Sequence, residues 1–368
     1  MASDSLDVNQ PHGSMAGPPA RSAPAGGPPA PGPPASGAPA GTLRLGPDAA
    51  GVAEAAALLR AGALVAFPTE TVYGLGADAG EPAAVAGIYA AKERPRFNPL
   101  IAHLPDLAAA RREGAFGPAA LRLAEAFWPG PLTLVVPAAE GGRICDLARA
   151  GLPSVALRVP AGGLAHALLA ATGRPVAAPS ANRSGRVSPT QAAHVLGDLD
   201  GRIAAILDGG PCPVGVESTI VACLAGGPAL LRPGGVAREA IEAVLGGRLA
   251  ALATAPEAPV APGLLASHYA PRARVRLDAE AVAPGEAVLL FGAARPAGIE
   301  AAGACLDLSP AGDAVEAAAN LFSHLRRLDA SGAATIAVVP IPPAGLGEAI
   351  RDRLQRAAAP RPGGPAPP

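Results

Sequence analysis

The alternation of short apolar runs with helical stretches is the feature that most limits how this chain can fold. From Thr42 onward, runs of strand length such as Ala63–Phe67 and Leu100–His103 are separated by stretches with helical periodicity. Strands that alternate with helices pack as a sheet covered by helices. The pattern continues to about Gly247, so it predicts an α/β domain with an open, twisted sheet over 42–248.

Within this domain, capping residues and glycines suggest where elements begin and end. Asp48 is predicted to cap a first helix, and a second helix is predicted to begin near Glu81. Thr69–Gly76 is predicted to be a loop, and Ser188 is predicted to start a later helix. Further strands are expected near 203–207, 216–222 and 229–231.

Three segments flank or divide the predicted domains. Residues 1–41 are rich in Pro, Gly and Ala and carry almost no large apolar side chain, so we expect a disordered tail. Residues 249–271 are expected to form a linker, and 359–368 a second disordered tail. A smaller, Rossmann-like α/β domain is expected over 272–358, with strands near 274–277, 286–291 and 334–339.

Composition excludes several classes of protein. The net charge is −1, so no global field attracts nucleic acid or an anionic membrane, and any phosphate binding must be local. The four cysteines are isolated, with no pair at metal-binding spacing. No apolar run is long enough to span a bilayer, and no secretory leader pattern is present. These features predict a cytoplasmic protein.

Polar residues gather where the predicted strands end. In open α/β sheets, ligands bind in the crevice beyond the strand ends. Hydroxyls, basic side chains and close-approach glycines at such a place describe a pocket for a polyanion, because they donate to phosphate oxygens and neutralise their charge. The residues concerned are Thr71, Arg158, Ser180, Asn182, Ser218 and Arg232.

Lys92 is the only lysine of the chain, and it lies near the end of the second predicted helix, two residues before Arg94. A lysine ammonium is a compact point charge, whereas arginine is a planar fork, so the two are not equivalent against a crowded phosphate. Chance in a lysine-poor chain is the alternative. No phosphate-loop, dinucleotide or Ser–His–Asp motif is present. His103 follows an apolar run, and the sequence leaves two roles open for it: packing in the core or binding a ligand.

Seven segments occur in an order that resembles the YrdC-like family. They are Pro68–Gly76, Lys92 with Arg94, Asn98–Ile101, Pro129–Thr133, Pro179–Asn182, Glu217–Thr219 and Arg232–Gly234. Within that family, His268–Pro271 and the second α/β unit are similar to the longer, two-domain threonylcarbamoyl-adenylate synthases. The resemblance covers roughly 42–358.

This resemblance implies a nucleotidyltransferase that condenses L-threonine, bicarbonate or CO₂, and ATP to threonylcarbamoyl-AMP and pyrophosphate. The product would serve threonylcarbamoyladenosine formation in tRNA, so the implied partner is the downstream tRNA-modifying machinery. Mg²⁺ would be held by the ATP phosphates rather than by a protein metal site, and no permanently bound cofactor or membrane partner is implied. Binding of double-stranded RNA or tRNA stays open as an additional property.

The resemblance also implies roles for individual residues. Lys92 and Arg94 would be catalytic and would bind the ATP phosphates. The other ATP-binding residues would be Asn98, Ser154, Ser180, Asn182, Ser188, Arg232, His268 and Tyr269. L-threonine would be held by Thr71, His103, Arg158, Ala178 and Ser218. The linker around His268 and Tyr269 would fold over the pocket as a lid.

Two other functions are compatible with a basic crevice on an α/β domain. A double-stranded RNA or tRNA-binding module without catalysis would use the same basic crevice, but neutral net charge and few basic clusters elsewhere argue against it. A carbamoyl-transfer enzyme built on a related domain would carry zinc-finger-like cysteine clusters and an acylphosphatase segment. The sequence shows neither pattern.

Overall fold

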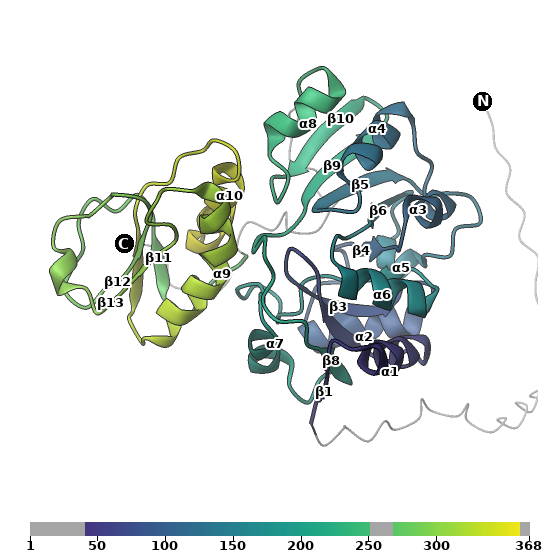
Figure 1. Ribbon diagram of the computed structural model, residues 1–368, viewed down its shortest axis with the longest axis horizontal. Helices are drawn as coiled ribbons and strands as arrows, with labels where there is room; N and C mark the ends of the chain where they lie inside the picture. The colour runs from purple at the N-terminus through teal and green to yellow at the C-terminus, as the bar shows by residue number, and fades with distance from the viewer. Residues whose placement is uncertain (1–40, 251–267, 361–368) are drawn as a thin grey trace, which may run out of the picture. The chain divides into compact units, whose positions relative to one another are not determined.

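The computed structural model describes residues 41–250 and 268–360. Residues 1–40 and 361–368 of the predicted tails 1–41 and 359–368, and residues 251–267 of the predicted linker, lie outside the described residues. The described part forms one large mixed sheet and one small parallel sheet, each with its own helices (Figure 1).

Ten strands form the large sheet. In spatial order they are β1 (Leu43–Leu45), β8 (Ala205–Leu207), β2 (Val65–Pro68), β3 (Tyr73–Asp78), β7 (Val176–Ala177), β4 (Ile101–His103), β6 (Ser154–Arg158), β5 (Leu132–Pro137), β9 (Thr219–Leu224) and β10 (Gly227–Arg232). Strand β4 is parallel to β6, while β5 is antiparallel to β6 and parallel to β9. Strand β10 is antiparallel to β9. The ends of β4, β6 and β10 therefore meet the beginnings of β5 and β9 at one edge of the sheet.

Helices cover both faces of this sheet. They are α1 (Ala49–Arg60), α2 (Pro82–Lys92), α3 (Leu107–Glu113), α4 (Pro118–Phe127), α5 (Asp146–Arg149), α6 (Gly163–Thr172), α7 (Ala192–Leu199) and α8 (Arg238–Leu245). Alternate residues of a strand face opposite sides. Accordingly, Val65 and Phe67 of β2 pack with α1 and α6, while Ala66 packs in the core that contains α2 and α4. Helix α1 begins at the side chain of Asp48, which accepts from Gly51 N.

The small sheet has four parallel strands, in the order β11 (Arg274–Arg276), β14 (Thr335–Val338), β12 (Ala287–Leu290) and β13 (Ala304–Asp307). Helices α9 (Ala314–Ala330) and α10 (Gly347–Ala358) pack on it, and the short 3₁₀ helix η1 covers Ile299–Ala301. Helix α9 buries an apolar stripe that includes Leu321 and Leu325. Among the helices described here, none is both long and apolar enough to cross a membrane.

The predicted architecture is confirmed, but several local expectations are wrong. The loop expected over Thr69–Gly76 overlaps strand β3, which begins at Tyr73. Its glycines serve close packing rather than a turn, because a Cβ on Gly74 would lie 3.1 Å from Ala178 Cβ. The helix expected from Ser188 begins at Ala192, and the strand expected from 216 begins at Thr219. Strand β13 was not predicted.

The helices of the small sheet pack against loops of the large one. The core around α9 and α10 includes Val72, Val187 and Val216 from those loops. Gly215 has φ +74°, and a Cβ there would lie 2.3 Å from the carbonyl oxygen of Ala318 in α9. The loop before β9 therefore lies with its backbone directly on α9.

Substitution Gly215→Ala tests this close approach. We expect a loss in unfolding free energy of roughly 2–4 kcal/mol, from the left-handed backbone conformation and the steric overlap together. The matched control is Gly246→Ala, at φ +69° with open space around the added Cβ, where only about 1 kcal/mol should be lost. Urea unfolding measures both, and equal losses would contradict the contact.

Candidate active site

A pocket opens at the edge where these strand ends and beginnings meet. Its lining includes ten residues that the sequence singled out: Thr71, Arg94, His103, Arg158, Ala178, Ser180, Ser218, Arg232, His268 and Tyr269. Glu217 and Ser218 come immediately before β9, not after a strand as expected, because the sheet is mixed. The structure thus gathers residues from segments separated by almost 200 positions.

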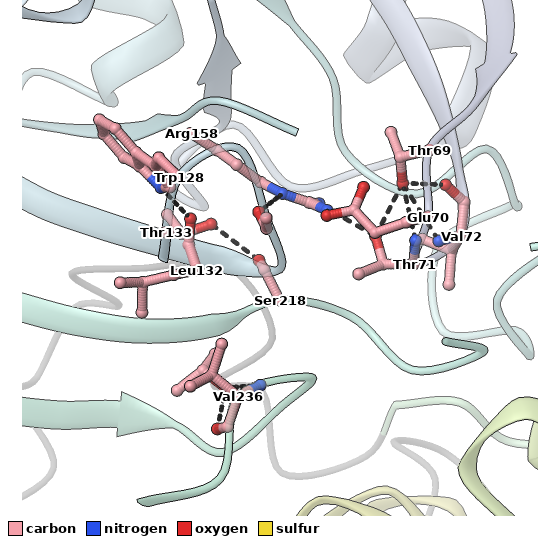
Figure 2. Close-up of polar contacts among 12 residues, drawn as sticks. Thr69, Glu70, Thr71, Val72, Trp128, Leu132, Thr133, Arg158, Ser218 and Val236 are labelled. Atoms are coloured by element: carbon pink, nitrogen blue, oxygen red, sulfur yellow. Dashed lines mark hydrogen bonds and ion pairs between the residues drawn. The ribbon is translucent and has the colours of Figure 1, made fainter. Parts of the chain in front are cut away.

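Arg158, at the end of β6, is held by the turn between β2 and β3 (Figure 2). Its Nη1 donates to Thr71 Oγ1 at 3.0 Å, and its Nε donates to the carbonyl oxygen of Gly130 at 3.3 Å. Thr69 Oγ1 lies 2.7 Å from Thr71 Oγ1 and donates its own proton to the carbonyl oxygen of Val72. Thr71 must then be the donor to Thr69, because a hydroxyl has one proton. The chain of bonds fixes the orientation of the Thr71 hydroxyl.

Glu70 pairs with the same guanidinium. Its Oε1 lies 2.7 Å from Arg158 Nη2, and both side chains are buried. Neither carboxylate oxygen accepts a well-formed hydrogen bond from a described residue. A buried arginine requires a partner charge of this kind. The carboxylate also shows what Arg158 can bind, because a guanidinium fork matches a carboxylate in shape and charge.

His103 ends β4 and faces the same pocket. It is buried, and its ring meets Phe67 edge-on at a centroid distance of 6.2 Å. Burial, with the nearby charge of Arg158, lowers the pKa of His103 to about 3. The imidazole is therefore neutral at physiological pH. The sequence left a packing role and a binding role open for His103, and the two are compatible, because this packed histidine also lines the pocket.

Ser218 and Arg232 form a second polar group across the pocket. Ser218 Oγ lies 2.7 Å from Thr133 Oγ1 of β5. Arg232 Nη2 donates to the Ser218 carbonyl oxygen at 2.8 Å and to Ser218 Oγ at 3.3 Å. Thr219, the next residue, donates from its Oγ1 to the carbonyl oxygen of Val236 at 2.6 Å, which fixes the start of β9.

Lys92 lies behind the pocket wall. Its Nζ donates to the carbonyl oxygens of Ser180 and Asn182, and its own carbonyl accepts from Ser184 N at 2.8 Å. Burial and the neighbouring Arg94 hold the pKa of Lys92 well below its usual range. The only lysine thus anchors the loop that follows β7, a role that the sequence did not indicate.

Several buried polar atoms of residues 94–98 and 182, close to this lysine or its bonded loop in sequence, have unmet hydrogen-bonding capacity. Asn98 is fully buried, and neither its Oδ1 nor its Nδ2 has a partner among the described residues. The same holds for Arg94 Nε and Asn182 Oδ1. Buried polar atoms are nearly always paired. A group of unpaired ones beside basic side chains is chemically suited to a polar, anionic ligand.

The remaining predicted residues lie in different places. Ser188 is buried, and its Oγ donates to Glu217 Oε1 at 2.5 Å. The N–H of Ala178 donates to the carbonyl oxygen of Ile101, so only its own carbonyl is left for a ligand. Ser154 begins β6 and lies about 13 Å along the strand from Arg158. The structure does not bring Ser154 to the pocket.

His268 and Tyr269 close one side of the pocket. Tyr269 stacks on Phe322 of α9 with ring centroids 5.5 Å apart, although its φ of 61° is unusual for a residue with a side chain. Burial and four nearby cations, Arg94 foremost, lower the pKa of His268 far below its usual value. The ring next to the basic groups is therefore neutral.

Two family models match the chain. The model described as "Telomere recombination" matches residues 57–234, and "Threonylcarbamoyl-AMP synthase, C-terminal domain" matches residues 236–359. The threonylcarbamoyl-AMP synthase of Bacillus subtilis (strain 168) is 43% identical over 323 residues, 83% of this chain and 92% of the relative. The chain belongs to the threonylcarbamoyl-AMP synthase family. It is accordingly an enzyme of the nucleotidyltransferase type.

A second relative extends the likeness to structure. The threonylcarbamoyl-AMP synthase of Pyrococcus abyssi (strain GE5 / Orsay) is 41% identical over 82% of this chain and 92% of the relative. The crystal structure of P. abyssi Sua5 complexed with L-threonine matches with a TM-score of 0.77 and 37% identity. The match covers 86% of this chain and 97% of that one, so both α/β units are included.

Some residues that shape the site were not singled out from the sequence. Glu70, Glu217 and Thr133 lay inside recognised motifs, but nothing in the motifs indicated that they hold other side chains rather than a ligand. Arg353 of α10 was missed altogether. Its helix carries several arginines, and one buried member among them leaves no mark in the sequence.

The lowered pKa of His103 predicts a loss of stability in acid. The folded state binds a proton only near pH 3, whereas the unfolded chain does so near 6.5, so stability is full above 6.5 and declines as pH falls toward 3. At pH 4.5 this group alone should cost about 2.7 kcal/mol. His103→Gln should remove that part of the pH dependence in chemical unfolding. The exposed His166→Gln is the control, and identical pH profiles for all three proteins would contradict the prediction.

Proposed function

We propose that the chain condenses L-threonine, bicarbonate or CO₂, and ATP to threonylcarbamoyl-AMP and pyrophosphate. The observation that carries the proposal is one pocket with two kinds of polar group. Arg158 with Thr71 suits a carboxylate, and Arg94 with Arg232 suits a polyphosphate. Asn98 and Asn182 are not in the pocket lining, but they carry buried polar atoms without a partner among the described residues. Family membership supplies the reaction that joins two such ligands.

The threonine end comprises Thr71, His103, Arg158, Ala178 and Ser218. Arg158 would pair with the threonine carboxylate, sharing its guanidinium with Glu70. His103 has too low a pKa to hold a proton near neutrality, so we assign it to orienting threonine rather than to proton transfer. The carbonyl of Ala178 can accept from the threonine amine.

The nucleotide end comprises Lys92, Arg94, Asn98, Ser180, Asn182, Ser188 and Arg232, with MgATP as the substrate. A lysine ammonium has three protons, and the two carbonyls of the 180–182 loop take two of them. The third is available to a phosphate oxygen. Lys92 would thus hold both the loop and the nucleotide. Ser154 is left out of this proposal because of its position at the far end of β6.

The chemistry requires positioning more than a reactive side chain. The threonine amine attacks CO₂ to give a carbamate, a carbamate oxygen attacks the α-phosphorus, and pyrophosphate leaves. Cationic groups fixed before the reaction stabilise the charge that builds on the transferring phosphate. Lys92, Arg94 and Arg232 are the groups to which we assign that task.

The domain roles follow from this chemistry. We assign catalysis to residues 42–248, a linker and lid to 249–271 and a supporting role to 272–358. His268 and Tyr269 would exclude water from the labile mixed anhydride. The product would pass to tRNA-modifying machinery that forms threonylcarbamoyladenosine, in the cytoplasm. No observation in the structure favours RNA binding over this reaction.

Omitting substrates one at a time tests the reaction. Pyrophosphate release from ATP should require both L-threonine and bicarbonate, because the carbamate is the nucleophile. Removing either should reduce the rate to background in a coupled pyrophosphate assay. Release that continues without threonine would refute the proposal.

Substitution of Lys92 tests the phosphate role. Lys92→Ala should reduce threonine-dependent pyrophosphate release by roughly 10²-fold or more, because a group stabilising transition-state charge is lost. Lys92→Arg should also be impaired, since the larger fork does not fit between two carbonyls in a buried space. Arg96→Ala, which removes an exposed cation of the loop after α2, is the control. Near-normal turnover of Lys92→Ala would exclude the role.

A further inference from the structure

Arg353 has no role in the proposed reaction, yet its side chain is completely buried. It lies on α10, in the second α/β unit. Its Nε donates to Glu217 Oε2 at 2.9 Å, and its Nη1 donates to the Pro233 carbonyl oxygen at 2.7 Å and to Asp352 Oδ2 at 2.8 Å. Its guanidinium carbon lies 5.3 Å from the centre of the Tyr269 ring.

Three of these contacts reach segments that form the pocket. Glu217 lines the pocket next to Ser218, and Tyr269 lines it directly. Pro233 follows Arg232, another lining residue. One guanidinium from the second unit therefore touches the segment before β9, the end of β10 and the His268–Tyr269 segment.

Stability alone gives a poor account of this arrangement. Removing two charges from water costs about as much as their attraction returns, so a buried ion pair is weak evidence for stabilisation. A planar guanidinium donates in fixed directions, so it fixes the positions of several acceptors relative to one another. Glu217 is fixed from its other side as well, since its Oε1 accepts from Ser188.

Tyr269 needs such a support. Its left-handed backbone conformation is unfavourable for a residue with a side chain and persists only where surrounding contacts over-determine it. The Phe322 ring stacks on the Tyr269 ring, and the Arg353 guanidinium lies over the Tyr269 ring. Both groups come from the second unit. The Tyr269 ring is therefore held against the pocket by side chains of the second unit.

We propose that Arg353 is a positioning residue through which the second unit completes the active site. It sets Glu217 beside the Ser218 segment and holds Tyr269 closed over the pocket. The catalytic consequence rests on the proposed function: the closed Tyr269 keeps water from the mixed anhydride. Loss of Arg353 then uncouples the reaction, because hydrolysis of the anhydride releases AMP after pyrophosphate has already left.

The test compares Arg353→Lys with Arg238→Met. Arg238 of α8 pairs with Glu348 of α10, so it joins the same two units away from the pocket. For Arg353→Lys we expect the yield of threonylcarbamoyl-AMP per pyrophosphate to fall, with kcat/KM reduced by up to roughly 10²-fold. Arg238→Met should keep the wild-type yield. An unchanged yield in Arg353→Lys, or an equal fall in both variants, would overturn the proposal.

Two further measurements keep the test decisive. The double variant Arg353→Met, Glu217→Gln removes both charges, so it avoids an unpaired buried carboxylate should the single variant fail to fold. It should still lose yield, and restored yield would show that Arg353 only neutralises Glu217. Amide hydrogen exchange measures how firmly the segment around Tyr269 is held, independently of catalytic activity. Ala270 N, which donates to the Gly185 carbonyl oxygen, should exchange faster in Arg353→Lys and not in Arg238→Met.

The exchange measurement also separates the two proposals. A wild-type chain that releases no threonine-dependent pyrophosphate would refute the proposed reaction, while faster exchange in Arg353→Lys would still support the positioning role. Unchanged exchange at Ala270 would overturn that role whatever the activity.

Discussion

The concentration of buried positive charge is the constraint on which the rest of the site depends. Lys92, Arg94, Arg158, Arg232 and Arg353 are all buried. An ion removed from water requires a partner charge or several hydrogen bonds. Glu70 supplies that charge for Arg158, and Glu217 supplies it for Arg353. The positions of both carboxylates are thus fixed by the cations they serve.

Backbone carbonyl oxygens stabilise the other buried cations by accepting their hydrogen bonds. Lys92 takes two from the loop after β7, Arg94 takes that of Pro99, and Arg232 takes that of Ser218. Carbonyl dipoles stabilise a cation without cancelling its charge. The pocket therefore keeps a positive potential, which adds to burial, the larger cause, in lowering the pKa values of Lys92 and His268. A bound polyanion relieves that potential, so the same arrangement that costs folding energy favours a triphosphate.

How far the sequence could predict this site depended on topology. The ends of β4, β6 and β10 carry His103, Arg158 and Arg232, which follow the simple rule of strand ends. Ser218 breaks the rule because β9 runs the other way, and an alternating pattern of apolar runs does not reveal strand direction. Strand β3 was missed because Gly74 and Gly76 resemble turn residues, although here they allow neighbouring side chains to approach. Arg353 depends on contacts between units distant in sequence, and local pattern carries no trace of them.

The second unit follows from the same constraint. The loops that carry Thr71, Ser188 and Ser218 connect elements of the large sheet domain, and each has a valine within two residues of that polar residue. These valines, Val72, Val187 and Val216, pack in the core of α9 and α10. Gly215 brings one of these loops into backbone contact with α9, and Arg326 of α9 donates to the carbonyl oxygen of Val187 in another. A loop held only by its polar contacts would leave buried cations free to move away from their partners. Packing the loops on the second unit limits that freedom, so the smaller unit supports loops whose residues line the pocket.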